Sequence, residues 1–207
     1  ERAELVFLAC PNNPTGNLWP EAAVRRIVDN YMGLVVIDEA YWPYAVRDHL
    51  HLVSDHVVVV RTFSKLGWAG LRIGYLIGDA ALVQELNKVR LPYNVGRLNQ
   101  AAALVFLEHW DVFMEIAAKV RAERARLSAM LAEIPGAEVF PSETNFVLVR
   151  VPDAVRADAA LKQRGIWVKN LHGTHPELHH CLRITVGLPE ENDEVVEALA
   201  SVFREAA

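Results

Sequence analysis

Four consecutive valines, Val57–Val60, most constrain how this chain can fold. An apolar run without polar alternation is typical of a strand that is buried on both faces, as in a parallel sheet. The run is followed by Thr62, Ser64 and Lys65, and then, after two glycines, by Arg72. Open α/β sheets bind ligands just beyond the carboxyl ends of their strands. The segment therefore predicts either a site where a lysine forms an imine with a phosphorylated cofactor, or a surface loop with solvated charges.

The composition is that of a globular protein. The chain has 207 residues, of which 52% are hydrophobic and 23% are charged, and its formal net charge is −5. A sizeable core is therefore available, in one large domain or two small ones. The acidic balance and the lack of a basic run argue against nucleic acid as a partner. No apolar run approaches the roughly 20 residues that span a bilayer, and we expect no signal peptide and no membrane partner.

The cysteines and histidines favour neither a disulfide framework nor a metal site. Cys10 and Cys181 lie far apart in apolar segments, so we expect buried free thiols in a reducing cytosol and a cytoplasmic protein. Four histidines crowd one short segment, but they are not spaced on a helix with a supporting carboxylate. We interpret them as a polar loop and predict no metal: His172, His175, His179 and His180.

Two more apolar runs end in polar residues. Leu5–Ala9 predicts a strand, and the prolines and glycine of Pro11–Gly16 predict a turn that presents the amide of Asn13, or else a plain loop. Leu34–Ile37 predicts a second strand, which ends at Asp38. An acid in this position needs a cation or several hydrogen-bond donors. It fits either the partner of a cofactor's pyridinium nitrogen or the N-cap of a short helical turn.

Four segments, in this order, resemble the fold-type-I enzymes that use pyridoxal 5'-phosphate (PLP), and within them the family of histidinol-phosphate aminotransferases. The segments are Pro11–Gly16 (PNNPTG), Asp38–Tyr41 (DEAY), Val57–Tyr75 with its lysine, and Cys181–Gly187 (CLRITVG). Four ordered motifs are far more specific than one. The resemblance covers nearly the whole chain. It implies an α/β fold, in which a portion of the PLP-transferase-like large domain with a mostly parallel sheet precedes a smaller α+β carboxyl-terminal domain.

The resemblance also implies which residues hold the cofactor ring. Lys65 is expected to form the imine with PLP and to act as the catalytic proton shuttle. Asp38 is expected to keep the ring nitrogen protonated, which makes the ring an electron sink. Asn13 and Tyr41 are expected to hydrogen-bond to the phenolic oxygen of the ring. Glu39 alternates to the other face of the strand, so we expect it to be structural.

Further residues are expected to hold the phosphate and the substrate. The resemblance assigns the phosphate to Thr62, Ser64 and Arg72. The spacing from Lys65 to Arg72 is one residue shorter than in many relatives, which we interpret as a trimmed loop. Arg183 lies in a strand whose neighbouring apolar residues point the opposite way, so it could grip a substrate carboxylate. The alternative is a surface arginine on an edge strand.

A long amphipathic helix of the kind predicted in the middle of the chain commonly connects two domains, so we place a domain boundary near its start. We expect a partial PLP-binding large domain over residues 1–112 and a small carboxyl-terminal domain over 113–207, which includes a long connecting helix at 111–134. Helices are expected at 20–30, 80–90, 97–110, 154–164 and 190–205. Beyond the first strands, strands are expected at 73–77, 137–140, 145–150, 166–169 and 181–186.

The chain opens on what reads as a central strand, which leads us to expect a fragment. Leu5–Ala9 needs neighbouring strands, and the resemblance implies that roughly two-fifths of the family's length is absent before it. A phosphate cradle at a helix amino end and an aromatic stacked on the cofactor ring are expected in that absent part. We therefore expect the 207-residue chain alone to be inactive.

The function implied by the resemblance is PLP-dependent transamination in histidine biosynthesis. Histidinol phosphate and 2-oxoglutarate/glutamate are the expected amino donor and 2-oxo acid pair, and a homodimer is the expected assembly. Two alternatives remain within reach of the sequence. One is another class I/II aminotransferase or a related PLP decarboxylase, and the other is a non-catalytic aminotransferase-like sensory domain of a transcription regulator.

Overall fold

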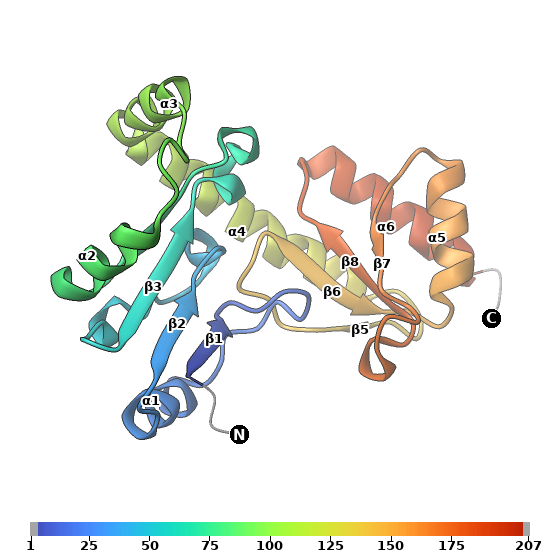
Figure 1. The fold of residues 1–207 in the computed structure, drawn as a ribbon. Coiled ribbons are helices and arrows are strands. Elements are labelled where there is room, and N and C mark those ends of the chain that lie inside the picture. Colours follow the sequence, from blue (N-terminus) through green and yellow to red (C-terminus); the bar gives the residue numbers. More distant parts are fainter. Residues whose placement is uncertain (1–3, 205–207) are drawn as a thin grey trace. The chain divides into compact units, whose positions relative to one another are not determined.

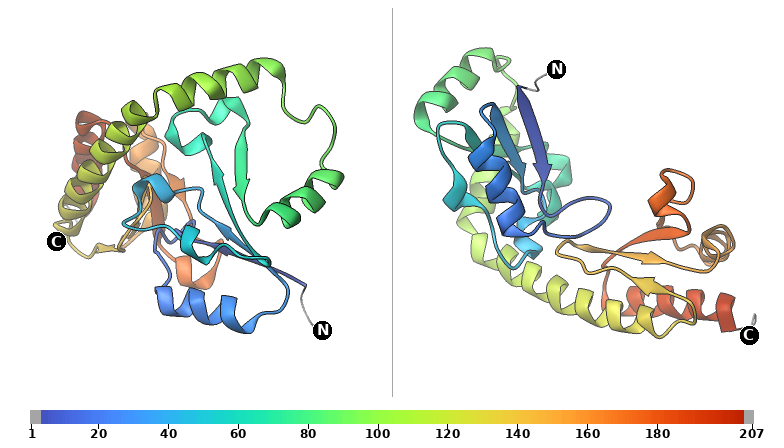
Figure 2. Two further views of the ribbon diagram at one scale, coloured as in Figure 1. Left: turned by 90° about the vertical axis from the view of Figure 1, so that its left-hand side faces the viewer. Right: turned by 90° about the horizontal axis from the view of Figure 1, so that it is seen from below.

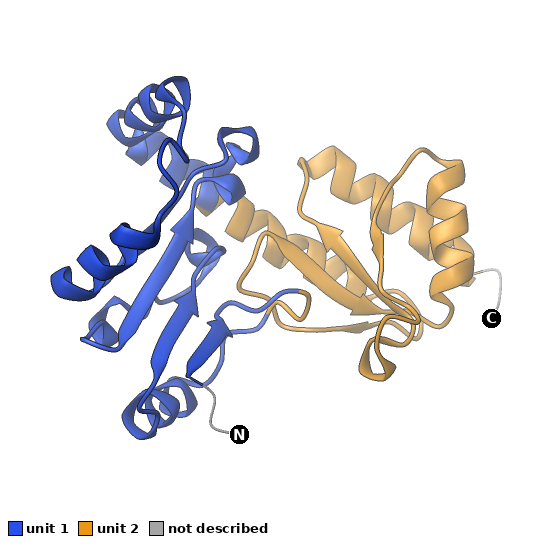
Figure 3. Ribbon diagram, viewed as in Figure 1, with its two compact units in different colours: residues 1–13, 17–117 blue, residues 14–16, 118–207 orange. Residues whose placement is uncertain are grey.

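The computed structural model describes residues 4–204, which form two compact units (Figure 3). Among these residues, the first unit comprises 4–13 and 17–117, and the second comprises 14–16 and 118–204. The division falls within one long helix, α4 (Trp110–Ala132). The domain boundary expected from the sequence, between residues 112 and 113, falls within the same helix and stays a prediction.

The first unit is built on a four-stranded sheet in which the strands follow one another in sequence order (Figure 1). Strands β1 (Leu5–Ala9), β2 (Leu34–Asp38) and β3 (Val57–Thr62) are parallel, and β4 (Gly74–Ile77) pairs with β3 in the antiparallel direction. Val57, Val58 and Val59 are fully buried, as a continuous apolar run predicts. The mostly parallel sheet expected from the sequence is confirmed.

Helix α1 (Glu21–Asn30) packs on one face of this sheet (Figure 2). Its buried residues Val24 and Val28 belong to the same core cluster as Val35, Ile37 and Val59 of the strands. The helix begins directly after Pro20, which the sequence predicted as its first residue. Glu21 at the amino end suits the positive end of the helix dipole.

Two more helices follow β4. Helix α2 (Ala80–Val89) is capped by Asp79, whose Oδ1 accepts hydrogen bonds from the backbone nitrogens of Ala81 and Leu82 over 2.9 and 3.3 Å. Aspartate is one of the residues that most favour the N-cap position of a helix. Helix α3 (Arg97–Glu108) follows, and its buried Phe106 stacks at 4.1 Å between ring centroids on Phe113 of α4.

The second unit has a four-stranded antiparallel sheet in the order β5–β6–β8–β7. The strands are β5 (Glu138–Val139), β6 (Phe146–Arg150), β7 (Lys169–Asn170) and β8 (Cys181–Thr185). Val147, Val149, Leu182 and Ile184 face a core that they share with α4, α5 (Ala154–Gln163) and α6 (Pro189–Arg204). An antiparallel sheet with helices on one face is an α+β arrangement, as expected.

One strand expected in this unit is shorter and lies later than the sequence predicts. Residues 166–168 form no strand, and β7 covers only Lys169–Asn170, which pair with Arg183 and Leu182 of β8. Ile166 and Val168 instead pack against the helical core, while Trp167 stays 78% exposed. The alternation of buried and exposed side chains therefore arises in a connecting segment that packs on the core. A period of two alone cannot distinguish such a segment from a strand.

Candidate active site

A pocket of about 310 Å³ lies at the carboxyl ends of β1 and β2, where open α/β sheets bind ligands. Every residue that lines it belongs to the first unit. Four of the residues expected from the sequence to hold a cofactor ring meet here. The lining consists of Ala9, Pro11, Asn13, Asp38, Ala40, Tyr41 and Lys65.

Asp38 is the last residue of β2 and pairs in register with Ala9 of β1 and Val60 of β3. Its Oδ1 accepts a hydrogen bond from the backbone nitrogen of Ala40 over 2.9 Å, so the carboxylate closes a tight turn. The 3-10 helix that follows, η1 (Trp42–Tyr44), has Tyr41 in the capping position and no side-chain cap. Asp38 is therefore not the N-cap of that helix, although the sequence allowed this role as an alternative to a cofactor ligand. Its carboxylate is left half-buried at the pocket.

Lys65 lies in a second short 3-10 helix, η3 (Ser64–Leu66), directly after β3. Its neighbours Phe63 and Leu66 are buried, which anchors the turn. The Nζ atom of Lys65 lies 5.2 Å from the centre of the Tyr41 ring. The hydroxyl of Tyr44 donates a 2.5 Å hydrogen bond to the carbonyl oxygen of Lys65, so the backbone of the lysine is tied as well.

Asn13 and Tyr41 complete the polar lining. Tyr41 is 7% exposed and follows the Asp38 turn, whereas Asn13 is exposed on the loop after β1. That loop is closed by a backbone hydrogen bond from Asn12 to Asn17 of 2.9 Å. An amine, a carboxylate, a phenol and an amide thus surround one volume.

The three residues expected to hold a phosphate do not line this pocket. The hydroxyl of Thr62 lies 3.0 Å from that of Ser64 and 3.2 Å from the carbonyl oxygen of Ile73, and it accepts from the backbone nitrogen of Ser64. Arg72 is exposed, has a positive φ of 54°, and donates to the carbonyl of Ala69 over 3.1 Å. Their role as phosphate ligands stays a prediction.

A network that the sequence did not indicate lies on the opposite face of the same strand ends. The carboxylate of Glu39, which is 1% exposed, binds Arg61 through Nε at 2.9 Å and Nη2 at 2.7 Å. It also binds His49 through the backbone nitrogen at 2.6 Å and Nδ1 at 3.0 Å. Glu39 and Arg61 each lie one position beyond Asp38 and Val60, which pair in register, so they alternate to the opposite face, and this alternation was the available signal. His49 offered no such signal, because it lies in an irregular segment.

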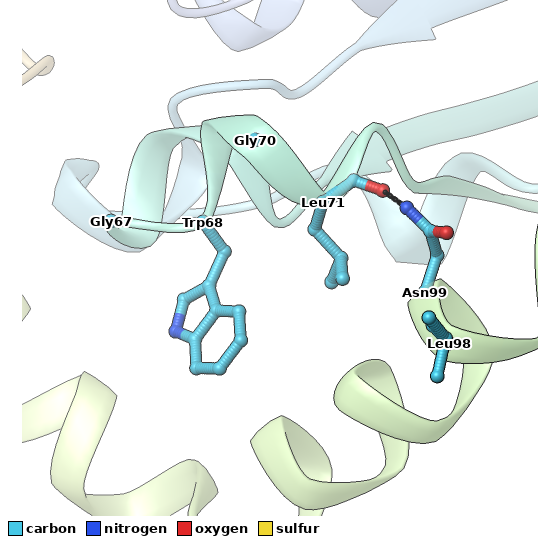
Figure 4. Close-up of a pocket in the computed structure, with 6 residues that line it drawn as sticks. All are labelled: Gly67, Trp68, Gly70, Leu71, Leu98 and Asn99. Carbon is cyan, nitrogen blue, oxygen red and sulfur yellow. Dashed lines mark hydrogen bonds between the residues drawn. The ribbon is translucent and has the colours of Figure 1, made fainter.

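A second pocket, of about 400 Å³, adjoins the lysine segment (Figure 4). It is lined by Gly67, Trp68, Gly70, Leu71, Leu98 and Asn99, and the Asn99 side chain donates to the Leu71 carbonyl over 2.9 Å. None of these side chains can act as an acid, a base or a nucleophile at neutral pH. Although this pocket is the larger one, the chemistry favours the pocket at Asp38 and Lys65.

Arg183 belongs to the second unit. Its neighbours Leu182 and Ile184 point into the helical core, as the strand alternation predicts, and Arg183 lies on the other face with its guanidinium carbon 5.0 Å from the centre of the Phe146 ring. The side chain is half-buried on the central strand β8 of that sheet, not on an edge strand. Its role toward a substrate stays a prediction.

Three of the four crowded histidines gather in the second unit. His172, His179 and His180 have potential ligand atoms within 4.8 Å of one another. The Nδ1 atom of His172 accepts from the backbone nitrogen of His180 over 3.1 Å, and that of His180 accepts from Ala154 over 3.2 Å. A neutral imidazole that accepts through Nδ1 carries its proton on Nε2. Binding a metal through Nε2 would therefore require both hydrogen bonds to break, which disfavours a metal here.

The chain belongs to the class I and II aminotransferase family, whose family model matches residues 1–199. It is 56% identical over 207 residues to the histidinol-phosphate aminotransferase of Methylibium petroleiphilum, a match that covers 98% of this chain and 56% of that protein. It is 49% identical over 205 residues to the enzyme of the same name from Chromobacterium violaceum, covering 98% of this chain and 58% of that protein. The chain thus spans little more than half the length of these curated relatives.

Solved structures agree with the family. The chain is similar to the crystal structure of histidinol-phosphate aminotransferase from Sinorhizobium meliloti in complex with pyridoxal-5'-phosphate, with a TM-score of 0.86 and 35% sequence identity. That match covers 99% of this chain and 59% of the Sinorhizobium chain.

Among the described residues, no helix is long and apolar enough to cross a membrane.

Proposed function

We propose that the pocket at Asp38 and Lys65 binds PLP and that the protein catalyses transamination. The observation that carries this proposal is the convergence of Asn13, Asp38, Tyr41 and Lys65 around one volume at the ends of β1 and β2. These four groups match the three functional edges of PLP. The lysine amine suits its carbonyl, the carboxylate suits its pyridinium nitrogen, and the phenol and amide suit its phenolic oxygen.

When bound, PLP supplies an electron sink for the charge that develops at the substrate's α-carbon. Lys65 would supply the amine that binds the cofactor carbonyl and, once the substrate amine has replaced it there, would move the proton at the substrate's α-carbon. Asp38 would hold the proton on the ring nitrogen, and Tyr41 and Asn13 would orient the phenolic edge. A fixed orientation of these groups is itself a large part of the rate enhancement in such reactions.

The phosphate and the substrate carboxylate have candidate partners outside the pocket lining. We assign the phosphate to Thr62, Ser64 and Arg72, which flank Lys65 along the chain. Arg183 would hold the carboxylate of glutamate or 2-oxoglutarate through two parallel hydrogen bonds.

We propose histidinol phosphate as the amino donor and 2-oxoglutarate as the acceptor. In this reaction the amino group passes to 2-oxoglutarate, which becomes glutamate, while histidinol phosphate becomes the corresponding ketone. The support is the identity of 56% and 49% to two proteins named histidinol-phosphate aminotransferase. We also propose a homodimer located in the cytoplasm. The buried free thiols of Cys10 and Cys181 support a reducing compartment.

The experiment uses the product of the complete open reading frame, because this chain covers little more than half of its relatives. PLP is titrated by absorbance, and the glutamate and histidinol phosphate half-reactions are followed separately. Lys65→Ala should lose both the absorbance of lysine-bound PLP and turnover. Lys88→Ala, on the exposed face of α2 where Lys88 pairs with Glu85, is the matched control and should retain both.

Three results would contradict the proposal. Full turnover in Lys65→Ala would remove the lysine from the reaction. Loss of carbon dioxide from an amino acid without amino transfer would indicate a decarboxylase. PLP binding without turnover of any amino donor would favour a sensory domain.

A further inference from the structure

The carboxylate of Glu39 forms hydrogen bonds with His49 that join the two ends of one loop, on the face of the sheet opposite the pocket. The Oε1 atom of Glu39 accepts from the backbone nitrogen of His49 over 2.6 Å and from its Nδ1 over 3.0 Å. Both residues are buried, with exposures of 1% and 0%. We call this pair the clasp, and residues 40–48 between its members the clasp loop.

The clasp loop carries two side chains that contact Lys65. The Tyr41 ring lies 5.2 Å from the Nζ atom of the lysine, and the Tyr44 hydroxyl donates to the lysine carbonyl over 2.5 Å. One contact therefore concerns the reactive end of the lysine, and the other concerns its backbone. No element of regular α-helix or strand lies in the clasp loop, which contains only the three-residue η1. Its path thus depends on contacts at its ends and along its side chains.

The clasp is bound to the strands on either side of β2. Arg61 at the end of β3 places Nε and Nη2 on the other carboxylate oxygen of Glu39, at 2.9 and 2.7 Å. Cys10, directly after β1, places its Sγ 3.8 Å from Nε2 of His49. Ala9, Asp38 and Val60 are in register on the three strands. The residues that directly follow them are Cys10, Glu39 and Arg61, so these three project from the face opposite Asp38. The clasp therefore lies directly behind the pocket wall.

All hydrogen-bonding positions of the Glu39 carboxylate are occupied, which explains how it can be buried. A buried acid that loses its partners is strongly unfavourable, so a variant that breaks the clasp should rearrange the loop. A carboxylate only accepts, so Nδ1 of His49 is the donor and Nε2 faces Cys10. The other ring beside His49 is His51, whose centroid is 6.5 Å away and whose Nε2 bonds Glu21 on the surface.

We propose that the clasp is a positioning device: by closing the loop that carries Tyr41 and Tyr44, Glu39 and His49 set the position of Lys65 for the cofactor. The predicted effect on PLP binding rests on the proposed function. The prediction that the clasp holds residues 40–48 in place does not. A purely structural core pair would stabilise the fold without changing how Lys65 meets PLP. The two possibilities therefore differ at temperatures well below unfolding.

The test compares three variants and one control in the product of the complete reading frame. His49→Asn keeps a side-chain donor near the position of Nδ1, whereas His49→Leu removes it. Glu39→Gln keeps the size of the acceptor and removes its charge. His51→Leu is the control, because His51 is a neighbouring histidine with a 44% exposed side chain outside the clasp.

Two readouts are taken for each protein. Amide hydrogen exchange of residues 40–48 is measured without cofactor, and PLP affinity is measured by absorbance titration. In His49→Leu and Glu39→Gln we expect exchange of the clasp loop to rise at least about tenfold and PLP affinity to fall roughly tenfold to a hundredfold. In His49→Asn, the slow exchange of the clasp loop and the PLP affinity should both be largely retained. His51→Leu should match the unchanged protein in both readouts.

The proposal is overturned if exchange of the clasp loop is unchanged in folded His49→Leu or Glu39→Gln, or if it rises in these variants while their PLP affinity stays the same. If His49→Leu does not fold, the same criteria apply to Glu39→Gln, which conserves side-chain volume. If the unchanged protein fails to bind PLP, the proposed function fails. The exchange data then decide alone whether the clasp holds the loop.

Discussion

The hydroxyl of Tyr44 donates a hydrogen bond of 2.5 Å to the backbone carbonyl oxygen of Lys65. Burial raises the pKa of this phenol to about 12, so Tyr44 remains protonated and able to donate across the physiological pH range. The backbone carbonyl of Lys65, the lysine that we propose to bind PLP, is thereby held by a donor that stays protonated throughout that range.

Tyr44→Phe should leave this carbonyl without its donor while the ring still packs. Loss of a partner from a buried polar group costs about 1–3 kcal/mol, so we expect the free energy of unfolding to fall by that amount. Urea denaturation measures this change in the free energy of unfolding. Tyr93→Phe is the control, because Tyr93 is 99% exposed. Equal stability of the two variants would show that the bond contributes nothing.

His49 should make stability depend on pH. Its hydrogen bonds with Cys10 and Glu39 raise the pKa of His49 from 6.5 to about 9 in the folded protein. The stabilisation is therefore fully present below about pH 6.5, where both states are protonated, and it is lost as the pH rises through about 9. It amounts to at most about 3 kcal/mol.

The measurement for this prediction is the difference in unfolding free energy between the unchanged protein and His49→Asn, from pH 6 to pH 10. The difference should shrink toward high pH. The groups that face the ring are Cys10, Glu39 and His51, and the Cys10→Ser variant should lower the apparent pKa. A difference that is constant with pH would mean that His49 stays neutral when folded.

Asp38→Asn should separate shape from charge at the pocket. The amide oxygen can still accept from the backbone nitrogen of Ala40, so the turn should survive. Without the negative charge the ring nitrogen of PLP loses its proton, and we expect turnover to fall at least about a hundredfold while PLP remains bound. Single-turnover kinetics and PLP titration measure the two effects. Asp55→Asn, whose side chain is 91% exposed, should behave like the unchanged protein.

Arg183→Lys should affect the two half-reactions unequally. Histidinol phosphate carries no carboxylate, whereas glutamate does, and lysine cannot form the two parallel bonds of a guanidinium. We expect the KM for glutamate to rise roughly tenfold more than that for histidinol phosphate. Arg156→Lys, exposed on α5, is the control. Equal damage to both half-reactions would identify Arg183 as a structural residue.

The convergence of the pocket residues could be predicted because each follows an apolar strand or motif with a recognisable pattern. Asp38 and Lys65 come at the ends of Leu34–Ile37 and Val57–Val60, and parallel strands bring such ends to one edge. The clasp could not be predicted, because the path of an irregular loop has no period. The same reason hides the bond from Tyr44 to Lys65.

The misplaced strand has a different physical origin. Ile166 and Val168 alternate with polar or exposed residues, as a strand would, but their burial comes from the helical core and not from pairing. Backbone partners for that segment exist only at Lys169–Asn170. Periodicity reports which side chains are buried, and it is silent on what buries them.

The parallel pairing of β1, β2 and β3 has a consequence for how the pocket comes into being. Asn13 follows β1, Asp38 ends β2 and Lys65 follows β3, so the three residues are distant from one another along the chain and no local segment contains two of them. Such non-local contacts form only after the chain between them has given up its loop entropy, which makes parallel sheets slow to assemble. Cofactor capture by this unit would therefore act as a late marker of folding: a partly folded chain could hold each residue and still present no pocket.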